Sequence, residues 1–331
     1  MILGRNQQAL TMARTRSSRL AGVAVALAIF LAAAATAAAT KGPATPIAPA
    51  APAAVGDFAG LVDIGGGRRL YLECRGQGSP TVVLEAGYRN HGGIWSVEPV
   101  DGQQPTVLHG VAAFARVCSY DRPGTVLSPE DLSRSDPVPQ PRTAQDIVTD
   151  LHALLHAAAV AEPYVLVGHS DGGLFVRLYA STYPGEVVGM VLVDAFSEGL
   201  KAAMTPEQWA TALQLTQVVP PEFASLSLND VETIDTDAIA DRMREAAAAR
   251  PLPPMPLVVL TAGRLEELPE ELAEVLTTAE QASQAFLAAL VPNARHIVAS
   301  ESGHYIQLEQ PQLVIDAVQR VVAAVHDPRT W

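Results

Sequence analysis

The stretch Tyr164–Gly173, which reads YVLVGHSDGG, decides how this chain folds. An apolar strand pattern runs directly into Gly-x-Ser-x-Gly, and the apolar residues that follow recur with helical spacing. We therefore expect Ser170 on a sharp turn between a buried strand and a helix, where Gly168 and Gly172 let the two backbones approach closely. A serine held above a helix N-terminus in this way is presented as a nucleophile.

Composition bounds the class of protein. The chain has 331 residues, of which 49% are hydrophobic and 17% are charged, which is enough apolar material for a large folded core. Its formal net charge is -13, and no region carries the Lys/Arg clustering that a nucleic-acid surface needs. We therefore expect a globular protein whose partner is a small-molecule substrate and not a nucleic acid. The composition leaves the oligomeric state open.

The N-terminus has the pattern of a targeting segment. Four arginines precede the uncharged stretch Leu20–Ala39, whose strongly apolar part ends at Leu31. A basic start, a short apolar centre and an Ala-x-Ala-like end predict a signal peptide over residues 1–39, and therefore an exported protein. An uncleaved membrane anchor is the alternative, because about 20 uncharged residues can span a bilayer. Residues 40–56 are rich in Pro and Ala and predict an extended linker.

From residue 57 onward, strand and helix patterns alternate after an opening hairpin. The expected strands are Phe58–Ile64, Arg69–Cys74, Thr81–Leu84, Ala115–Tyr120, Tyr164–Val167, Val187–Val193, Leu257–Leu260 and Ala294–Ser300. Amphipathic helices are expected around Ile147–Leu155 and over Pro311–Val325. This alternation predicts an α/β core of residues 57–196 and 256–331, with a mostly parallel sheet covered by helices on both sides.

The connection between the sixth and seventh expected strands is about sixty residues long and shows no strand pattern. One helix is predicted to begin at Pro206 with a capping box, and another covers Asp237–Ala249. Because connections of this length usually carry function, we interpret residues 197–255 as a helical lid over the site. Its apolar side chains favour a hydrophobic substrate, and the alternative is that they only pack the lid on the core. They are Met204, Trp209, Leu213, Leu215, Val218, Val219 and Phe223.

A serine nucleophile needs a base, and His304 is the best candidate among the eight histidines. It lies in the segment Ser302–Tyr305 between the last strand and the last helix, which places it at the same carboxyl edge of the sheet as Ser170. The chain order of nucleophile, acid and histidine also fits this assignment. No spacing of histidine, cysteine or acidic residues indicates a metal site, and we expect neither a metal nor a cofactor.

The carboxylate that orients this base has two candidates. Asp194 directly follows the strand Val187–Val193, whereas Glu266 follows the next strand within an acidic run, and such a run is ordinarily a solvated helix face. Both strand ends can reach a histidine at this edge. We favour Asp194, because its position at a strand end is rigid, and keep Glu266 as the alternative. Either carboxylate would fix the imidazole tautomer and stabilise the imidazolium.

Two backbone N–H groups should form the oxyanion hole. One belongs to Asp171, directly after the nucleophile, and we assign the other to Tyr88 in the loop after the third strand. His169 is expected to shape the turn. The residues that we expect near the substrate are Gly87, His91, Trp95 and His169.

The chain contains two cysteines, Cys74 and Cys118. They lie near the ends of strands that would be neighbours in the sheet, and an even pair in an exported protein indicates a disulfide. Two buried thiols are the alternative.

Taken together, several motifs resemble the α/β-hydrolase superfamily, and more closely its lid-bearing bacterial serine hydrolases of the esterase/haloperoxidase-like branch. The resemblance covers about residues 57–331 and rests on Leu84–Gly87, Ser119–Gly124, Gly168–Gly173, Val191–Ala195 and Ser302–His304. It implies an eight-stranded, mostly parallel sheet with an inserted helical lid. Asp121–Gly124 recurs in the family as a structural turn, so we assign it no chemistry. The serine at the nucleophile position disfavours dehalogenases and epoxide hydrolases, which attack through a carboxylate.

The expected function is hydrolysis of a carboxylic ester of a hydrophobic small molecule through an acyl-enzyme on Ser170. The same triad could instead cleave an amide or a C–C bond, or transfer an acyl group. A non-catalytic ligand-binding homologue is a further alternative, although such a protein has no need of both Ser170 and His304. A membrane-tethered interaction protein is the third, since membrane contact would come through an uncleaved N-terminal segment. The fold does not decide among these functions.

Overall fold

A computed structural model describes residues 56–100, 102–216, 226, 229–264 and 270–331. The expected signal peptide over residues 1–39 lies outside these ranges, and so does the expected linker except for Gly56. None of the helices in the described ranges has both the length and the apolar character needed to cross a membrane.

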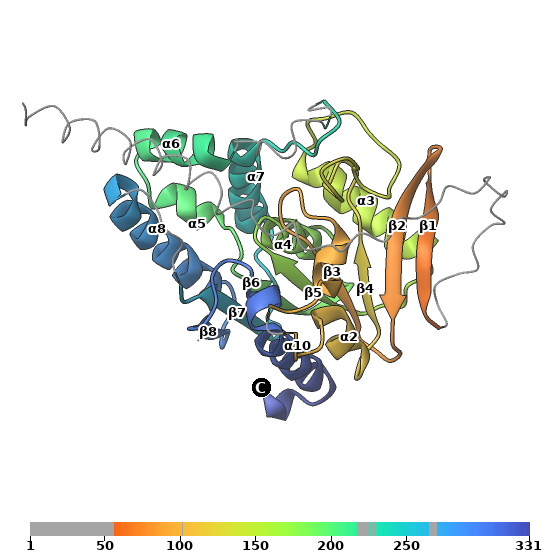
Figure 1. Ribbon diagram of the computed structural model, residues 1–331. Coiled ribbons are helices and arrows are strands. Elements are labelled where there is room, and N and C mark those ends of the chain that lie inside the picture. The colour runs from red at the N-terminus through yellow and green to blue at the C-terminus, as the bar shows by residue number, and fades with distance from the viewer. Residues whose placement is uncertain (1–55, 101, 217–225, 227–228, 265–269) are drawn as a thin grey trace, which may run out of the picture.

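The described strands form one eight-stranded sheet with the order β1-β2-β4-β3-β5-β6-β7-β8. The strands are β1 Phe58–Gly65, β2 Arg68–Arg75, β3 Thr81–Glu85, β4 Val117–Tyr120, β5 Tyr164–His169, β6 Val187–Val193, β7 Leu257–Ala262 and β8 Arg295–Ala299. β1 pairs antiparallel with β2 and β2 with β4, while the other neighbours are parallel. In Figure 1 the hairpin of β1 and β2 stands at one end of the sheet and β8 at the other. The expectation of an opening hairpin followed by a mostly parallel sheet is confirmed.

Helices cover both faces of the sheet. The helices are α2 Val107–Ala112, α3 Ala144–Ala157, α4 Gly172–Thr182, α5 Glu198–Ala202, α6 Pro206–Thr216, α7 Thr236–Ala249, α8 Glu270–Ala288, α9 Ile306–Glu309 and α10 Pro311–His326, with 3-10 turns η2 Gly92–Ser96 and η4 Pro328–Thr330. α3 begins at a full capping box, in which Thr143 and Asp146 bond each other's backbone N–H groups. α10 begins with a proline, which suits the first turn of a helix.

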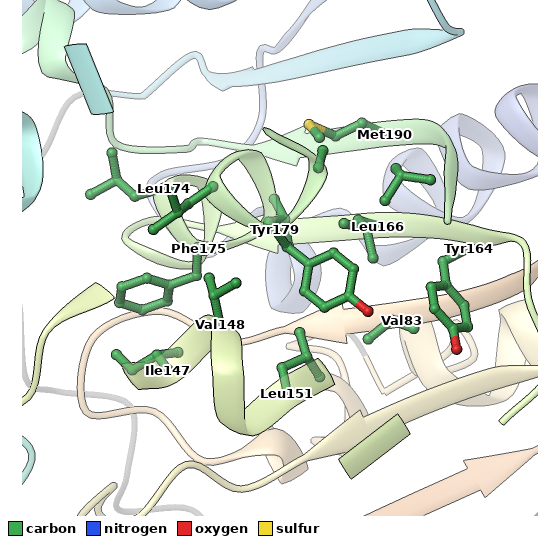
Figure 2. Packing of buried hydrophobic residues seen from close by; sticks show 14 of the residues in the cluster. Val83, Ile147, Val148, Leu151, Tyr164, Leu166, Leu174, Phe175, Tyr179 and Met190 are labelled. Atoms are coloured by element: carbon green, nitrogen blue, oxygen red, sulfur yellow. The ribbon is translucent and has the colours of Figure 1, made fainter. Parts of the chain in front are cut away.

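The core is divided by the sheet into two apolar clusters. One cluster lies under α3, α4, α7 and the end of α8, and the other lies under α2 and α10. Figure 2 shows part of the first cluster, where Ile147 and Leu151 of α3 lie close to Phe175 and Tyr179 of α4. β5 and β6 are buried on both faces, which explains their near-continuous apolar sequences. This double layer fixes the central strands, and therefore the turns at their ends.

The segment between β6 and β7 contains α5, α6 and α7, of which α5 packs against α7 and α8, and α7 against α4. The capping box before α6 forms as expected, because the Thr205 N–H donates to Gln208 Oε1 (2.9 Å) and the Gln208 N–H to Thr205 Oγ (3.3 Å). Trp209 is buried with Leu200 and Ala279. Val218, Val219 and Phe223 lie outside the described residues. The role of residues 197–255 as a lid stays a prediction.

Cys74 and Cys118 are directly opposite each other in the β2–β4 pair, and the structure joins them in a disulfide. Both are fully buried. The bond ties the antiparallel hairpin to the parallel part of the sheet.

Candidate active site

Ser170 lies on the turn between β5 and α4, with φ 53°. A non-glycine residue in this left-handed region is held there only when the surroundings fix it. Here the Ser170 N–H donates to the Val193 carbonyl (3.2 Å), and the Ser170 carbonyl accepts from the N–H groups of Gly173 and Phe196 (2.9 Å each). The turn is therefore anchored on both β6 and α4.

The glycines on either side of this serine are required by close approach. A Cβ on Gly168 would lie 2.6 Å from the Gly172 carbonyl oxygen, and a Cβ on Gly172 would lie 2.7 Å from the carbonyl oxygens of Glu85 and Ala86. Real Cβ contacts do not reach such distances, so larger residues would displace the backbone. The expected near-collision of strand and helix at this turn is confirmed.

Asp194 and His304 meet at the same edge of the sheet. The His304 Nδ1–H donates to Asp194 Oδ2 over 2.7 Å, and the other oxygen, Oδ1, accepts from the backbone N–H of Ala262 in β7 (2.8 Å). The backbone N–H of Asp194 also donates to the carbonyl of Leu260 (2.7 Å). With Nδ1 bonded to the carboxylate, the Nε2 of His304 is left as the proton acceptor of the ring.

The loop that carries His304 is held beside the nucleophile turn. His169 Nε2–H donates to the carbonyl of His304 (3.0 Å), and the two rings lie 4.6 Å apart between centroids. Burial, followed by the neighbouring His304, lowers the pKa of His169 well below its ordinary value, so His169 is neutral. The structure thus pairs His304 with Asp194 and packs the ring of His304 against His169, the residue that precedes Ser170. Glu266, the alternative acid, lies outside the described residues.

The expected oxyanion donors flank Ser170. Gly87 lies against the serine, because a Cβ placed on it would be 3.0 Å from Ser170 Cβ. Among the described residues, the backbone N–H groups of Tyr88 and Asp171 donate to no other group. Both are therefore available to a charge that develops beside Ser170.

A buried arginine holds the loop that carries Tyr88. Arg122 is 2% exposed and forms ion pairs with Glu85 (2.5 Å) and Glu232 (2.6 Å). Its guanidinium also donates to the carbonyls of Ala86 (2.8 Å) and Gly87 (2.7 Å). The sequence interpretation gave the Arg122 turn no chemistry, and the structure shows that Arg122 holds the loop that carries Tyr88. An arginine two residues beyond the end of an apolar strand was the available signal, but its partner Glu232 lies 110 residues away in the sequence.

Two further carboxyl groups near the site were not anticipated. Burial, and next the charge of Glu232, raises the pKa of the Asp171 side chain to about 6. Glu280 of α8 lies near enough to Asp194 and His304 for their charges to act on its carboxyl group, and its side chain is exposed to solvent. Because of this raised pKa, Asp171 next to Ser170 gains a proton more readily than an ordinary carboxyl does.

Of the four residues expected near the substrate, Trp95 and His169 are buried, His91 caps a 3-10 turn, and Gly87 lies against Ser170. His91 caps η2, where its Nδ1 accepts from the Gly93 N–H (3.1 Å), and burial lowers its pKa. Trp95 is 1% exposed and packs edge-on against His169, with ring centroids 6.5 Å apart. His169 is also 1% exposed. Trp95 and His169 are therefore enclosed by the protein, whereas Gly87 packs so closely against Ser170 that an added Cβ would lie 3.0 Å from the serine Cβ.

The chain is similar to known hydrolases in sequence. A family model described as the alpha/beta hydrolase family matches residues 82–317. A pimeloyl-[acyl-carrier protein] methyl ester esterase of Xanthomonas axonopodis pv. citri is 25% identical over 283 residues, which are 77% of this chain and 100% of that protein. A probable transporter, efuK of Hormonema carpetanum, is 30% identical over 147 residues, which are 42% of this chain. The aligned region is only 19% of that transporter, which is a much longer protein than this chain.

Solved structures show the same fold. A thermophilic esterase from Thermogutta terrifontis superposes with a TM-score of 0.53 over 82% of this chain and 100% of its own, at 18% sequence identity. At this identity the likeness establishes the architecture alone.

Proposed function

The chain belongs to the alpha/beta hydrolase family, and from this premise we propose that it is a serine hydrolase that cleaves a carboxylic ester of a hydrophobic small molecule. Ser170 would attack the ester carbonyl while His304 Nε2 accepts the serine proton. The tetrahedral oxyanion would accept hydrogen bonds from the backbone N–H groups of Tyr88 and Asp171. His304 would then protonate the leaving alcohol, and water would release the acyl group from Ser170 by the same steps in reverse.

The observation that carries the proposal is the bond between His304 Nδ1 and Asp194 Oδ2, 2.7 Å long, at the sheet edge where Ser170 is held at φ 53°. A histidine paired to a rigid carboxylate has one ring nitrogen left for proton transfer, which is the requirement of a general base. A serine in strained backbone geometry is a costly feature that functional sites retain. Together these features favour nucleophilic catalysis over ligand binding alone.

An ester substrate is favoured by the relatives. The Xanthomonas protein is named a methyl ester esterase, and the match with this chain covers the whole length of that protein. The apolar residues of segment 197–255, of which Trp209 is buried against Leu200 and Ala279, suit an apolar acyl or alcohol group. A series of esters with increasing acyl length would determine which length the enzyme prefers.

We also propose that the protein is exported. The basic and then apolar pattern of residues 1–39 supports this. The buried disulfide between Cys74 and Cys118 supports it independently, because disulfides persist in oxidising compartments.

The test is hydrolysis of p-nitrophenyl esters from acetate to palmitate by the purified chain, compared with Ser170→Ala and with the matched control Ser128→Ala. We expect turnover that is lost in Ser170→Ala and kept in Ser128→Ala. A fluorophosphonate should add its mass to the peptide that contains Ser170 in the wild-type chain only. Folded protein with neither ester turnover nor labelling would overturn the proposal. Labelling without ester turnover would instead favour amide or C–C cleavage on the same serine.

A further inference from the structure

A cluster of nitrogen and oxygen donors lies at the amino edge of the sheet, opposite the edge that carries Ser170. His152 and His156 are one turn apart near the end of α3, so they share a face of that helix. Glu186, the residue before β6, faces both of them. The ligand atoms of these three residues lie within 4.8 Å of one another. This is the one such group of three found among the residues that the structure describes.

We propose that His152, His156 and Glu186 form a binding site for a divalent metal ion of the Zn²⁺ type. The Nε2 atoms of the two histidines both approach the same carboxylate oxygen, Glu186 Oε1, at 3.1 and 3.6 Å. In a tetrahedral zinc site, bonds of 2.0–2.1 Å place neighbouring ligand atoms about 3.4 Å apart. The two Nε2–Oε1 distances of 3.1 and 3.6 Å lie on either side of this ligand-to-ligand distance. Small side-chain movements would therefore let these atoms bind one ion.

The donor set fits this class of metal. Two imidazoles and one carboxylate are ligands that zinc, copper and nickel accept, whereas calcium and magnesium prefer oxygen alone. Glu162 Oε1 lies 3.8 Å from His156 Nε2, and either this carboxylate or water can complete the coordination. The side chains of His152 and His156 are 29% and 48% exposed, so the ion can enter from solvent.

Two of the three ligands are already oriented by neighbours. The hydroxyl of Tyr179 donates to Glu186 Oε2 over 2.5 Å, which leaves Oε1 directed at the histidines. The ring of His152 stacks on Tyr183, with centroids 3.9 Å apart and planes 12° apart. Such supporting contacts fix the direction of metal ligands and strengthen binding. An ion here would join the end of α3 to the turn between α4 and β6.

The sequence did not predict this site, because Glu186 follows His152 by 34 residues. The two histidines, four residues apart, supply only two ligands, so their spacing alone does not indicate a metal site. The fold supplies the third ligand by packing α3 against α4. Because Glu186 precedes β6 while Asp194 follows it, the site and the proposed triad lie at opposite ends of the same strand.

The test is titration of the purified chain, carrying no polyhistidine tag, with ZnCl₂ by isothermal calorimetry and thermal unfolding. We expect one Zn²⁺ to bind with Kd of micromolar order or tighter, and Tm to rise by about 5 °C when zinc is present at a hundredfold of Kd. His156→Gln and Glu186→Gln should each weaken this binding at least tenfold. His326→Gln, which removes an exposed histidine at the end of α10, should leave it unchanged.

Co²⁺ bound in place of Zn²⁺ should give the intense visible absorption of a tetrahedral site in the wild-type chain and lose it in His156→Gln. Binding of equal strength in wild type, His156→Gln and Glu186→Gln would overturn the proposal, and so would a Kd in the millimolar range. In either case the histidine–glutamate contacts would be simple surface pairs. Neither result depends on ester turnover, so the proposed hydrolase function stands or fails separately.

Discussion

Asp194 receives a hydrogen bond from His304 on one carboxylate oxygen and from the Ala262 N–H of β7 on the other. The sheet therefore positions the Asp194 carboxylate independently of its bond to His304. Asp194 itself is held at φ 40°, in the left-handed region, at the end of β6. Two residues with strained backbones, Ser170 and Asp194, thus terminate the neighbouring strands β5 and β6. This pairing motivates the first prediction.

Asp194→Asn should lower kcat for ester hydrolysis by about 10⁴, because an amide allows the wrong imidazole tautomer and cannot stabilise the imidazolium. KM should change little. Steady-state kinetics checks this, with Glu266→Gln as the control expected to keep wild-type turnover. Loss of activity in Glu266→Gln but not in Asp194→Asn would reassign the acid to Glu266.

Arg122 should be required for stability as well as for the oxyanion loop. Arg122→Met leaves Glu85 and Glu232 buried without their shared cation, and breaking a buried ion pair in this way costs about 3–5 kcal/mol. Urea unfolding measures this loss. A Met variant with wild-type stability would show that the ion pairs of Arg122 make no net contribution to the stability of the fold.

Arg122→Lys separates the two roles of this side chain. Lysine keeps the positive charge but cannot reach both acids and the carbonyls of Ala86 and Gly87 together. We expect a smaller loss of stability than in the Met variant, with kcat reduced more than KM is changed. Wild-type kcat in the Lys variant would mean that the oxyanion loop is held without these bonds.

Asp171→Asn should stabilise the protein at alkaline pH. The pKa of Asp171 is raised from 3.8 to about 6 on folding, chiefly by burial. The folded state therefore binds this proton more tightly than the unfolded state does. The stabilisation is fully present below about pH 4 and is lost as the pH rises through 6.

Asparagine stays neutral throughout this range. The variant should match wild type near pH 4 and exceed its unfolding free energy by about 3 kcal/mol near pH 8. Chemical denaturation at both pH values measures the difference. A constant difference across the range would exclude titration of Asp171 as its cause.

The disulfide should contribute to stability through the loop that it closes. Cys74 and Cys118 are 44 residues apart, and in the chain-entropy model a loop of this length contributes about 4 kcal/mol. The double variant Cys74→Ala/Cys118→Ala should lose that amount in urea unfolding while keeping ester turnover. An unchanged midpoint would contradict the chain-entropy model for this bond, because removing the cross-link would then leave the free energy of the unfolded chain unchanged.

The elements that sequence reasoning located are those whose pattern is local. The apolar runs of β5 and β6, the Gly-x-Ser-x-Gly turn and the capping box before α6 each depend on a few neighbouring residues. The pairing of Asp194 with His304 was also accessible, because parallel strands bring their carboxyl ends to one edge. The expected start of β4 at Ala115 was two residues early, because the Ala115 N–H still bonds the Val111 carbonyl at the end of α2.

The features that sequence reasoning missed depend on distant partners or weak patterns. Glu232 pairs with Arg122 although the two residues are 110 positions apart in the sequence. Both are charged and buried, which a sequence pattern does not predict because charged residues are mostly exposed. α8 was not predicted, because only the acidic run at its start was considered, although Val275, Leu276 and Ala279 recur with helical spacing. Glu280 became a neighbour of Asp194 only through the placement of that helix.

His169 should act as a positioning residue for the base. Its Nε2–H donates to the His304 carbonyl, and the ring is fully enclosed by Trp95, His304 and Tyr305. His169→Phe keeps an aromatic ring of similar size but leaves the buried carbonyl without this donor, which costs about 1–3 kcal/mol. If the His304 loop moves because this bond is lost, the imidazole is misaligned, and kcat should fall about tenfold or more while KM is retained. A fall in stability with unchanged kcat would show instead that the bond holds the loop without aligning the catalytic ring.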